Sequence, residues 1–283
     1  MSKTRIFFLT LLAMIAFASN SLLCRLALKD TAIDPATFTF FRVLSGALAL
    51  WFVTRARRVS LNRAGNWPSA LALFVYVTAF SFAYVVLSAG TGALLLFCAV
   101  QATMILWGFY TGERLDLLQI FGLFVALSGL VLLVFPGLSA PPLFASILML
   151  TAGVAWGIYS LRGKATGDPI AVTTGNFIRA VLFTVTVCIA FTSRIHVSPG
   201  GIACAIFSGA ITSGLGYVIW YAALNGLKAT SAATVQLSVP VLAAAGGILL
   251  LGEPISLRYL FASVAILGGI ALVIWERPNA KQP

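Results

Sequence analysis

Residues 67–110 decide the fold, and they read WPSALALFVYVTAFSFAYVVLSAGTGALLLFCAVQATMILWGFY. The stretch contains no charged side chain, and its only break, at residues 88–90, separates two apolar runs of about 20 residues. Because an α-helix rises about 1.5 Å per residue, each run is long enough to cross a hydrocarbon core roughly 30 Å thick. The sequence therefore predicts two transmembrane helices, near 67–87 and 91–110, joined by a tight hairpin.

Composition extends this pattern to the whole chain. Of its 283 residues, 60% are hydrophobic and only 9% are charged, whereas a soluble domain carries roughly 25% charged residues. Further apolar runs bounded by charge, Pro or Gly predict eight more helices, near 6–28, 34–54, 117–134, 143–161, 169–191, 200–223, 229–251 and 257–275. We therefore expect an all-α integral membrane protein with ten transmembrane helices in the lipid bilayer.

The placement of charge fits membrane topology better than a nucleic-acid partner. The net charge is +11, and four arginines between residues 55 and 63 lie in one loop between apolar spans. When the two arginines inside spans are set aside, twelve of the 18 Lys and Arg residues lie on the side of the termini and four on the other. Since cytoplasmic loops carry the excess of Lys and Arg, we expect a multi-pass protein of a bacterial inner membrane with both termini in the cytoplasm.

Neither a metal site nor a cofactor is predicted. The four cysteines all fall in apolar spans without metal-binding spacing, and His196 stands alone in a loop. The sequence contains no Gly-x-x-x-x-Gly-Lys loop, so we do not expect ATP to drive the protein. An intramembrane enzyme would need a His or a carboxylate pair at matching depth. The sequence offers none, and we therefore expect a transporter and not an enzyme.

The two halves of the chain resemble each other at an offset of 137 to 140 residues. The matches keep one order along the chain: Ala16-Phe17 with Ala155-Trp156, Phe41-Arg42 with Ile178-Arg179, Tyr84 to Leu87 with Tyr221 to Leu224, Gly112-Glu113 with Gly252-Glu253, and Ser128-Gly129 with Gly268-Gly269. Such ordered matches indicate a duplication, which predicts one five-helix repeat over 1–135 and a second over 143–276. Because five is odd, the second repeat would insert inverted, an arrangement that places the substrate site of secondary transporters near the midplane.

Two signatures mark both halves. One is Phe40-Phe41-Arg42 and Phe177-Ile178-Arg179, early in spans two and seven; the other is Gly112-Glu113-Arg114-Leu115 and Gly252-Glu253-Pro254-Ile255, before the last helix of each half. Together with the ten spans, they resemble the drug/metabolite transporter superfamily and within it the EamA-type exporters, with the overall look closest to the aromatic amino acid exporter branch. The resemblance covers essentially the whole chain and implies export of a small metabolite.

Arg42 and Arg179 are the only charged residues that lie deep inside the predicted spans and not near a span end. Counted from the helix starts, they lie about 12 Å and about 16 Å deep. Burying a charge in hydrocarbon is costly, so such residues are candidates for function, and a guanidinium matches the carboxylate of a substrate. The alternative is structural, because an arginine also bonds helix carbonyls or extends towards water. The resemblance implies that this arginine is widespread among exporters of different substrates.

Polar and aromatic residues at mid-depth complete the candidate substrate site. They are Asn20, Tyr76, Phe80, Gln101, Trp156, Tyr159, Asn176, Tyr217, Gln236 and Ser238. Tyr and Trp combine an apolar face with a polar tip, which suits an amphiphilic solute, although helix packing explains any single ring equally well. Glu113 and Glu253 are candidate gate residues or, alternatively, helix-terminal carboxylates. Pro240 has no matching proline in the first half, where Val100 stands at the equivalent position, and it is a candidate hinge in span nine.

These observations favour a carrier that exports amino acids, preferentially apolar or aromatic ones, by alternating access without ATP. Efflux of cationic, drug-like compounds by proton antiport is one alternative, disfavoured because all seven acidic residues map to helix ends or loops. Sugar-phosphate or nucleotide-sugar exchange is another, and it would require several cavity-facing Lys or Arg. Spans five and ten hold few polar groups and are expected at the periphery, facing lipid or a second protomer, so the oligomeric state stays open.

Overall fold

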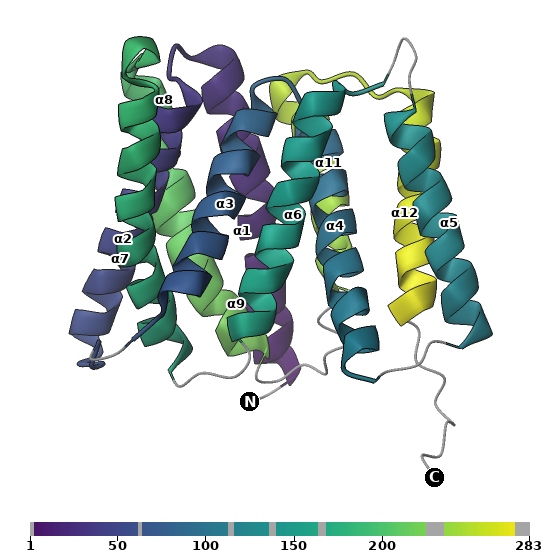
Figure 1. The fold of residues 1–283 in the computed structure, drawn as a ribbon, viewed down its shortest axis with the longest axis horizontal. Helices are drawn as coiled ribbons and strands as arrows, with labels where there is room; N and C mark the ends of the chain where they lie inside the picture. Colours follow the sequence, from purple (N-terminus) through teal and green to yellow (C-terminus); the bar gives the residue numbers. More distant parts are fainter. Residues whose placement is uncertain are drawn as a thin grey trace.

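The structure, a computed structural model, has only helices as regular elements within the residues that it describes. These are 3–61, 64–112, 116–135, 140–163, 168–224 and 235–274. The elements are α1 (Lys3–Asp30), α2 (Pro35–Ala56), α3 (Trp67–Tyr84), α4 (Ala89–Tyr110), α5 (Leu117–Val134), α6 (Leu143–Gly163), α7 (Pro169–Ala190), η1 (Thr192–Arg194), α8 (Pro199–Ile206), η2 (Phe207–Leu215), α9 (Gly216–Leu224), α11 (Ser238–Leu251) and α12 (Leu257–Ile274). The long helices stand side by side, and α1 begins at the edge of the bundle where α12 ends (Figure 1).

Eight helical segments within these ranges are long and apolar enough to cross a membrane, and the helices Ser238–Leu251 and Leu257–Val273 are apolar but shorter. The predicted all-helical, multi-span organisation is thereby confirmed. Most of the predicted boundaries lie within three residues of the observed ones. Helix α3 ends at Tyr84, three residues before the predicted end at Leu87. Of the predicted helix 229–251, residues 229–234 lie outside the described part, and α11 begins at Ser238.

Capping residues explain why several acidic side chains stay at helix ends. The Asp34 carboxylate accepts the backbone N–H groups of Ala36 and Thr37, both at 2.9 Å, and so satisfies donors that the first turn of α2 leaves free. Asp116 forms a capping box with Gln119 at the start of α5, and Asp168 caps α7. These carboxylates therefore begin helices and do not line the interior of the bundle.

The predicted single helix 200–223 contains a π-helical segment, η2, between α8 and α9. Glycines let η2 lie directly on α2: a Cβ atom at Gly209 would overlap the Arg42 carbonyl oxygen, and a Cβ atom at Gly46 would lie 3.0 Å from the Gly209 carbonyl oxygen. π-Helical turns are rare and are concentrated at functional sites, because the wider turn redirects side chains. The segment η2 brings three hydroxyl side chains to the centre of the bundle.

Helices α5 and α12 form a pair at the edge of the bundle (Figure 1). They approach closely because a glycine in α5 faces a glycine in α12, and a Cβ atom at Gly122 would lie 2.6 Å from the Gly269 carbonyl oxygen. Phe121 and Phe124 of α5 and Phe261 of α12 are exposed. The peripheral position expected for spans five and ten is what the structure has, and the remaining helices surround the candidate site.

Candidate substrate cavity and its closure

A small cavity lies at the centre of the bundle, between helices from both halves of the chain. Its volume is about 20 Å³. It is lined by Phe17, Asn20, Ser21, Tyr76, Phe80, Leu96, Phe97, Trp156 and Tyr217. A water molecule needs roughly 10–15 Å³ of such volume, whereas ligand sites measure roughly 300–1,000 Å³. The helices are therefore closed around this point, and a substrate would need the walls to separate.

Aromatic rings form most of the cavity wall. The Trp156 ring lies at the centre, with ring centroids 4.9 Å from Tyr76 and 4.9 Å from Tyr217. Phe17 meets the same group edge-on, 6.3 Å from Trp156 and 6.0 Å from Tyr217. Phe17 and Trp156 are equivalent at the offset of the internal repeat. The wall thus joins α1, α3, α6 and α9 through contacts that favour tilted and edge-to-face rings.

Asn20 connects the cavity to the π-helical segment η2. Its Oδ1 atom accepts hydrogen bonds from Ser208 Oγ at 2.5 Å and Thr212 Oγ1 at 3.0 Å, and its Nδ2 atom donates to Ser213 Oγ at 3.1 Å. A π-turn closes bonds five residues apart, so side chains separated by four and five residues share one face. The segment therefore presents three hydroxyl groups to one asparagine, and the polar floor of the cavity is a satisfied network.

Arg42 lies immediately behind the wall and is completely buried. Its Nη2 atom donates to the Tyr76 hydroxyl at 3.1 Å and to Ser213 Oγ at 3.4 Å, and the guanidinium carbon lies 4.6 Å from the centre of the Phe80 ring. Its Nε and Nη1 atoms have no hydrogen-bond partner, and no carboxylate pairs with it, among the described residues. A guanidinium stays charged in proteins, so this cation is buried without a counter-ion in the part of the chain that the structure describes.

Arg179, the counterpart of Arg42 in the second half, has a different environment. Its Nη1 atom donates to the carbonyl oxygens of Ala64 at 2.7 Å and Gly175 at 2.8 Å. Its guanidinium carbon also lies 5.8 Å from the centre of the Trp67 ring. Arg179 thus ties α7 to the loop between α2 and α3, which is the structural alternative considered for it, and it does not reach the central cavity.

The other predicted site residues divide between the cavity and its surroundings. Asn176 accepts the Asn66 backbone N–H at 2.9 Å, and with Tyr159 it lines a separate cavity of about 10 Å³ near the Arg179 end of the bundle. Gln101 is buried, and its Nε2 atom has no partner among the described residues, whereas Gln236 is buried and Ser238 is exposed, with its hydroxyl on the Val235 carbonyl. None of these five lines the central cavity.

Several residues at the centre of the bundle were not among the predicted site residues. They are Phe17, Ser21, Leu96 and Phe97 in the lining and Ser208, Thr212 and Ser213 in the hydroxyl network. The internal repeat does point to Phe17, because it matches the site candidate Trp156. No sequence pattern points to the three hydroxyl residues, since Ser and Thr inside an apolar helix commonly bond the carbonyl four residues earlier.

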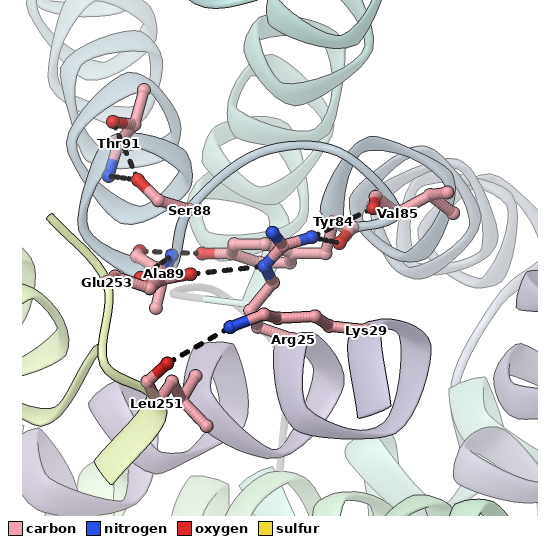
Figure 2. A network of polar contacts seen from close by, with 9 residues as sticks. All are labelled: Arg25, Lys29, Tyr84, Val85, Ser88, Ala89, Thr91, Leu251 and Glu253. Atoms are coloured by element: carbon pink, nitrogen blue, oxygen red, sulfur yellow. Dashed lines mark hydrogen bonds and ion pairs between the residues drawn. The ribbon is translucent and has the colours of Figure 1, made fainter. Parts of the chain in front are cut away.

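An ion pair between Arg25 and Glu253 joins helix ends beside the turn between α3 and α4 (Figure 2). Glu253 Oε1 accepts Arg25 Nε at 3.1 Å, and Glu253 Oε2 accepts the Ala89 backbone N–H at 2.8 Å. Arg25 Nη1 also donates to the carbonyl oxygens of Tyr84 at 3.0 Å and Val85 at 2.8 Å. The carboxylate thus meets the first N–H groups of α4 and the guanidinium meets the last carbonyls of α3, where opposite charges are favourable.

The Gly-Glu signature explains how Glu253 reaches this position. Gly252 ends α11 in the left-handed region, with φ +60°, which glycine adopts without steric cost. The chain then turns so that the Glu253 N–H donates to the Gly247 carbonyl at 3.1 Å. We call the group of Arg25, Glu253 and Ala89 the latch, because it fastens α1 and α11 to the α3–α4 hairpin. Lys29 adds a further bond to the Leu251 carbonyl at 3.0 Å (Figure 2).

The other gate and hinge candidates are only partly described. Glu113 lies outside the described residues. Pro240 is buried in the first turn of α11, just after the break in helical structure at Leu237. A proline is tolerated in a first turn because the N–H it lacks would find no partner there. The chain therefore does interrupt its helix beside Pro240.

Comparisons with known proteins agree with this architecture. Residues 4–135 and 143–275 each match the model of the EamA-like transporter family. An uncharacterized protein of Pseudomonas aeruginosa is 54% identical over 98% of this chain and 97% of its own length. An uncharacterized transporter of Archaeoglobus fulgidus is 25% identical over 96% of this chain and 97% of its own length. The threonine/homoserine exporter RhtA of Escherichia coli is 32% identical over 48% of each chain.

A solved crystal structure shares the fold, with a TM-score of 0.67 at 17% sequence identity, over 96% of this chain and 98% of the other. The two halves of the chain that match the family model separately are those between which the central cavity lies. The chain belongs to the EamA-like transporter family.

Proposed function

We propose that the protein is an inner-membrane carrier that exports amino acids, preferentially apolar or aromatic ones, by alternating access and without ATP. The observation that carries this proposal is the aromatic cavity between the two halves, closed at one end by the latch. A carrier needs a site reached from one side at a time. A central site behind a breakable polar closure meets that need.

The proposed architecture is ten transmembrane helices in two inverted five-helix repeats, 1–135 and 143–276. The separate family matches at 4–135 and 143–275 support the division. The direction of the first helix in each half supports the inversion, because α1 begins at the lower edge of Figure 1 and α6 at the upper edge. Phe80 and Tyr217, which are 137 residues apart, both line the cavity, as a two-fold relation through it would require.

The proposed orientation places both termini in the cytoplasm and the latch at the outer face. The excess of Lys and Arg on the side of the termini supports it. Arg25 and Lys29, which lie on the poorer side, use their charges on Glu253 and on helix carbonyls. The conformation described would then be closed to the outside.

The substrate class is supported by a relative and by the cavity. RhtA is named a threonine/homoserine exporter, and it resembles about half of this chain. The rings around Trp156 provide apolar faces for a side chain, and this cavity chemistry is the basis for a preference for apolar or aromatic amino acids. Proton antiport of cations is disfavoured because no carboxylate lines the cavity among the residues that the structure describes. Sugar-phosphate exchange is disfavoured because Arg42 is the only basic residue beside the cavity within the described part of the chain.

Counterflow in proteoliposomes tests this function. Vesicles are loaded with unlabelled Phe, Trp, Met or Thr, and uptake of the labelled amino acid is followed without an imposed ion gradient. We expect uptake for at least one of them. Absence of counterflow for every amino acid, together with uptake of a cationic dye under a proton gradient, would replace amino-acid export with cation efflux.

Trp156→Ala is expected to raise the half-saturating concentration about tenfold, because the variant loses ring contacts worth about 1.5 kcal/mol at the centre of the site. Trp107→Ala is the matched control. Trp107 lies in the same bundle but is 50% exposed, away from the cavity, and its loss should leave transport within about twofold of the wild type. Equal effects of the two substitutions would show that Trp156 has no special role in binding.

A further inference from the structure

We propose that Arg42 binds the carboxylate of the substrate, and that this carboxylate, rather than the α-ammonium group, is the obligatory feature of the substrate. The inference rests on the proposed function, because it assigns a substrate class to the same central site. It extends the substrate class from amino acids to monocarboxylates with an apolar side chain.

The first step concerns the unfilled bonding capacity of Arg42. The guanidinium is fully buried, and its Nε and Nη1 atoms have no partner among the described residues. Its two bonds go to neutral hydroxyl groups, at 3.1 Å to Tyr76 and 3.4 Å to Ser213. Removing an ion from water costs several kcal/mol unless an opposite charge or strong hydrogen bonds compensate. An anion is the ligand chemistry that this environment lacks.

The second step concerns how an anion would be held. A carboxylate forms charge-assisted hydrogen bonds with a guanidinium, about twice as strong as those of a neutral acceptor. The Tyr76 hydroxyl accepts from Arg42, so it retains a hydrogen that can point to a carboxylate oxygen, whereas the Ser213 hydroxyl, which also accepts from Arg42, donates to Asn20 Oδ1 at 3.5 Å. The Arg42 cation and the Tyr76 hydroxyl would then converge on the anion.

The third step concerns access. Arg42 lies behind Tyr76 and Phe80, and both of these rings line the cavity. The cavity is about 20 Å³ in volume, so any substrate requires the wall to separate. A separation that moves the Tyr76 and Phe80 rings admits a substrate and exposes the guanidinium at once. The cost of burying Arg42 would then be relieved when a carboxylate arrives.

The fourth step concerns the ammonium group. No carboxylate among the described residues lines the cavity, and Asn20 Oδ1 already accepts bonds from Ser208 and Thr212. The neutral Ser21 hydroxyl and the faces of the aromatic rings are left, and a ring attracts a cation with only about 0.5–2 kcal/mol. A compound that keeps the ammonium group but lacks the carboxylate also brings a net positive charge towards Arg42. The ammonium group is therefore the dispensable one.

Competition against labelled Phe in the counterflow assay tests this inference. The competitors are 3-phenylpropionate, which lacks the ammonium group, and phenylalaninamide and phenethylamine, which lack the carboxylate. We expect 3-phenylpropionate to compete within about tenfold of Phe, and the two amines to be weaker by about 100-fold or more, since they lose the charge-assisted bonds to Arg42. If Thr is the amino acid that gives counterflow, threonine amide and 3-hydroxybutyrate replace them.

Arg42→Gln separates binding from a purely structural role. The variant should lose the discrimination between acid and amide, whereas a structural defect would weaken both equally. Competition by phenylalaninamide equal to that of Phe in the wild type would overturn the carboxylate site and leave amino-acid transport standing. If no amino acid gives counterflow, the carboxylate site and amino-acid transport are both overturned. The wild-type series decides the question even if Arg42→Gln fails to fold.

Discussion

Gly209→Val is expected to destabilise the central bundle strongly. A Cβ atom at Gly209 would overlap the Arg42 carbonyl oxygen and the Ser45 hydroxyl. Because the first of these is backbone, α2 itself would have to move away from η2. Overpacking of this kind costs about 3 kcal/mol or more, and the same shift would displace the Arg42 guanidinium. We expect the apparent midpoint of thermal unfolding in detergent to fall by about 10 °C.

Gly268→Ala is the matched control for that variant. Gly268 lies in the middle of α12, and no atom lies within 4 Å of the position that its Cβ would take. Alanine favours a helix over glycine by roughly 0.5–1 kcal/mol, so this variant should unfold at or slightly above the wild-type temperature. A Gly209→Val protein that unfolds within about 2 °C of the wild type would contradict the close packing of η2 on α2.

Arg42→Lys is expected to lower kcat/KM for counterflow by about 100-fold, although the positive charge is kept. Lysine cannot stack a planar group on Phe80, and one ammonium cannot reproduce the fork of a guanidinium. The measurement is the initial rate of uptake at several substrate concentrations, with equal amounts of folded protein in the vesicles. This prediction has the largest expected effect on transport.

Arg179→Lys is the control within the same repeat pair. One guanidinium nitrogen of Arg179 donates hydrogen bonds to two backbone carbonyls, those of Ala64 and Gly175. A lysine ammonium can donate such bonds as well. We expect kcat/KM to stay within about threefold of the wild type. If the two substitutions reduce transport equally, Arg42 has the same structural role as its counterpart and no special place at the cavity.

The sequence predicts the helices well because their causes are local. Apolar runs set their lengths, and Asp34, Asp116 and Asp168 mark three of their starts. It also predicts that Tyr76, Trp156 and Tyr217 lie at mid-depth, and in the structure these rings meet. Mid-depth residues of neighbouring helices lie near one plane, because helices of similar length cross that plane at the same depth.

Two features could not be predicted, because their causes are not local. Arg42 and Arg179 share nearly the same sequence context, but partners from distant parts of the chain give them different environments. Arg179 bonds the Ala64 carbonyl, 115 residues before it, and Arg42 bonds Ser213, 171 residues after it. The π-helical segment 207–215 consists of small and apolar residues that suit an α-helix equally well. The irregular turn lies where α2 approaches at Gly209, a contact between distant segments that no pattern of apolar residues encodes.

The latch could be predicted from the sequence only in part. The Gly-Glu signature placed Glu253 at a helix end and suggested a gate, but its partner Arg25 is 228 residues away. Nothing in the sequence distinguishes Arg25 from other basic residues near a membrane surface. The pairing arises because α11 and α1 pack together beside the α3–α4 hairpin, which brings the residues to one point (Figure 2).

Reversible locking of the latch tests alternating access most directly. Arg25→Cys and Glu253→Cys are combined in a protein whose four native cysteines are replaced, joined by a short reducible cross-linker, and assayed for counterflow before and after reduction. The single-cysteine variants, treated with the same reagent, control for modification alone. We expect the cross-linked protein to lose at least about nine-tenths of its uptake and to regain it on reduction, because the site could no longer open at that end. Undiminished counterflow with the latch cross-linked would contradict the account.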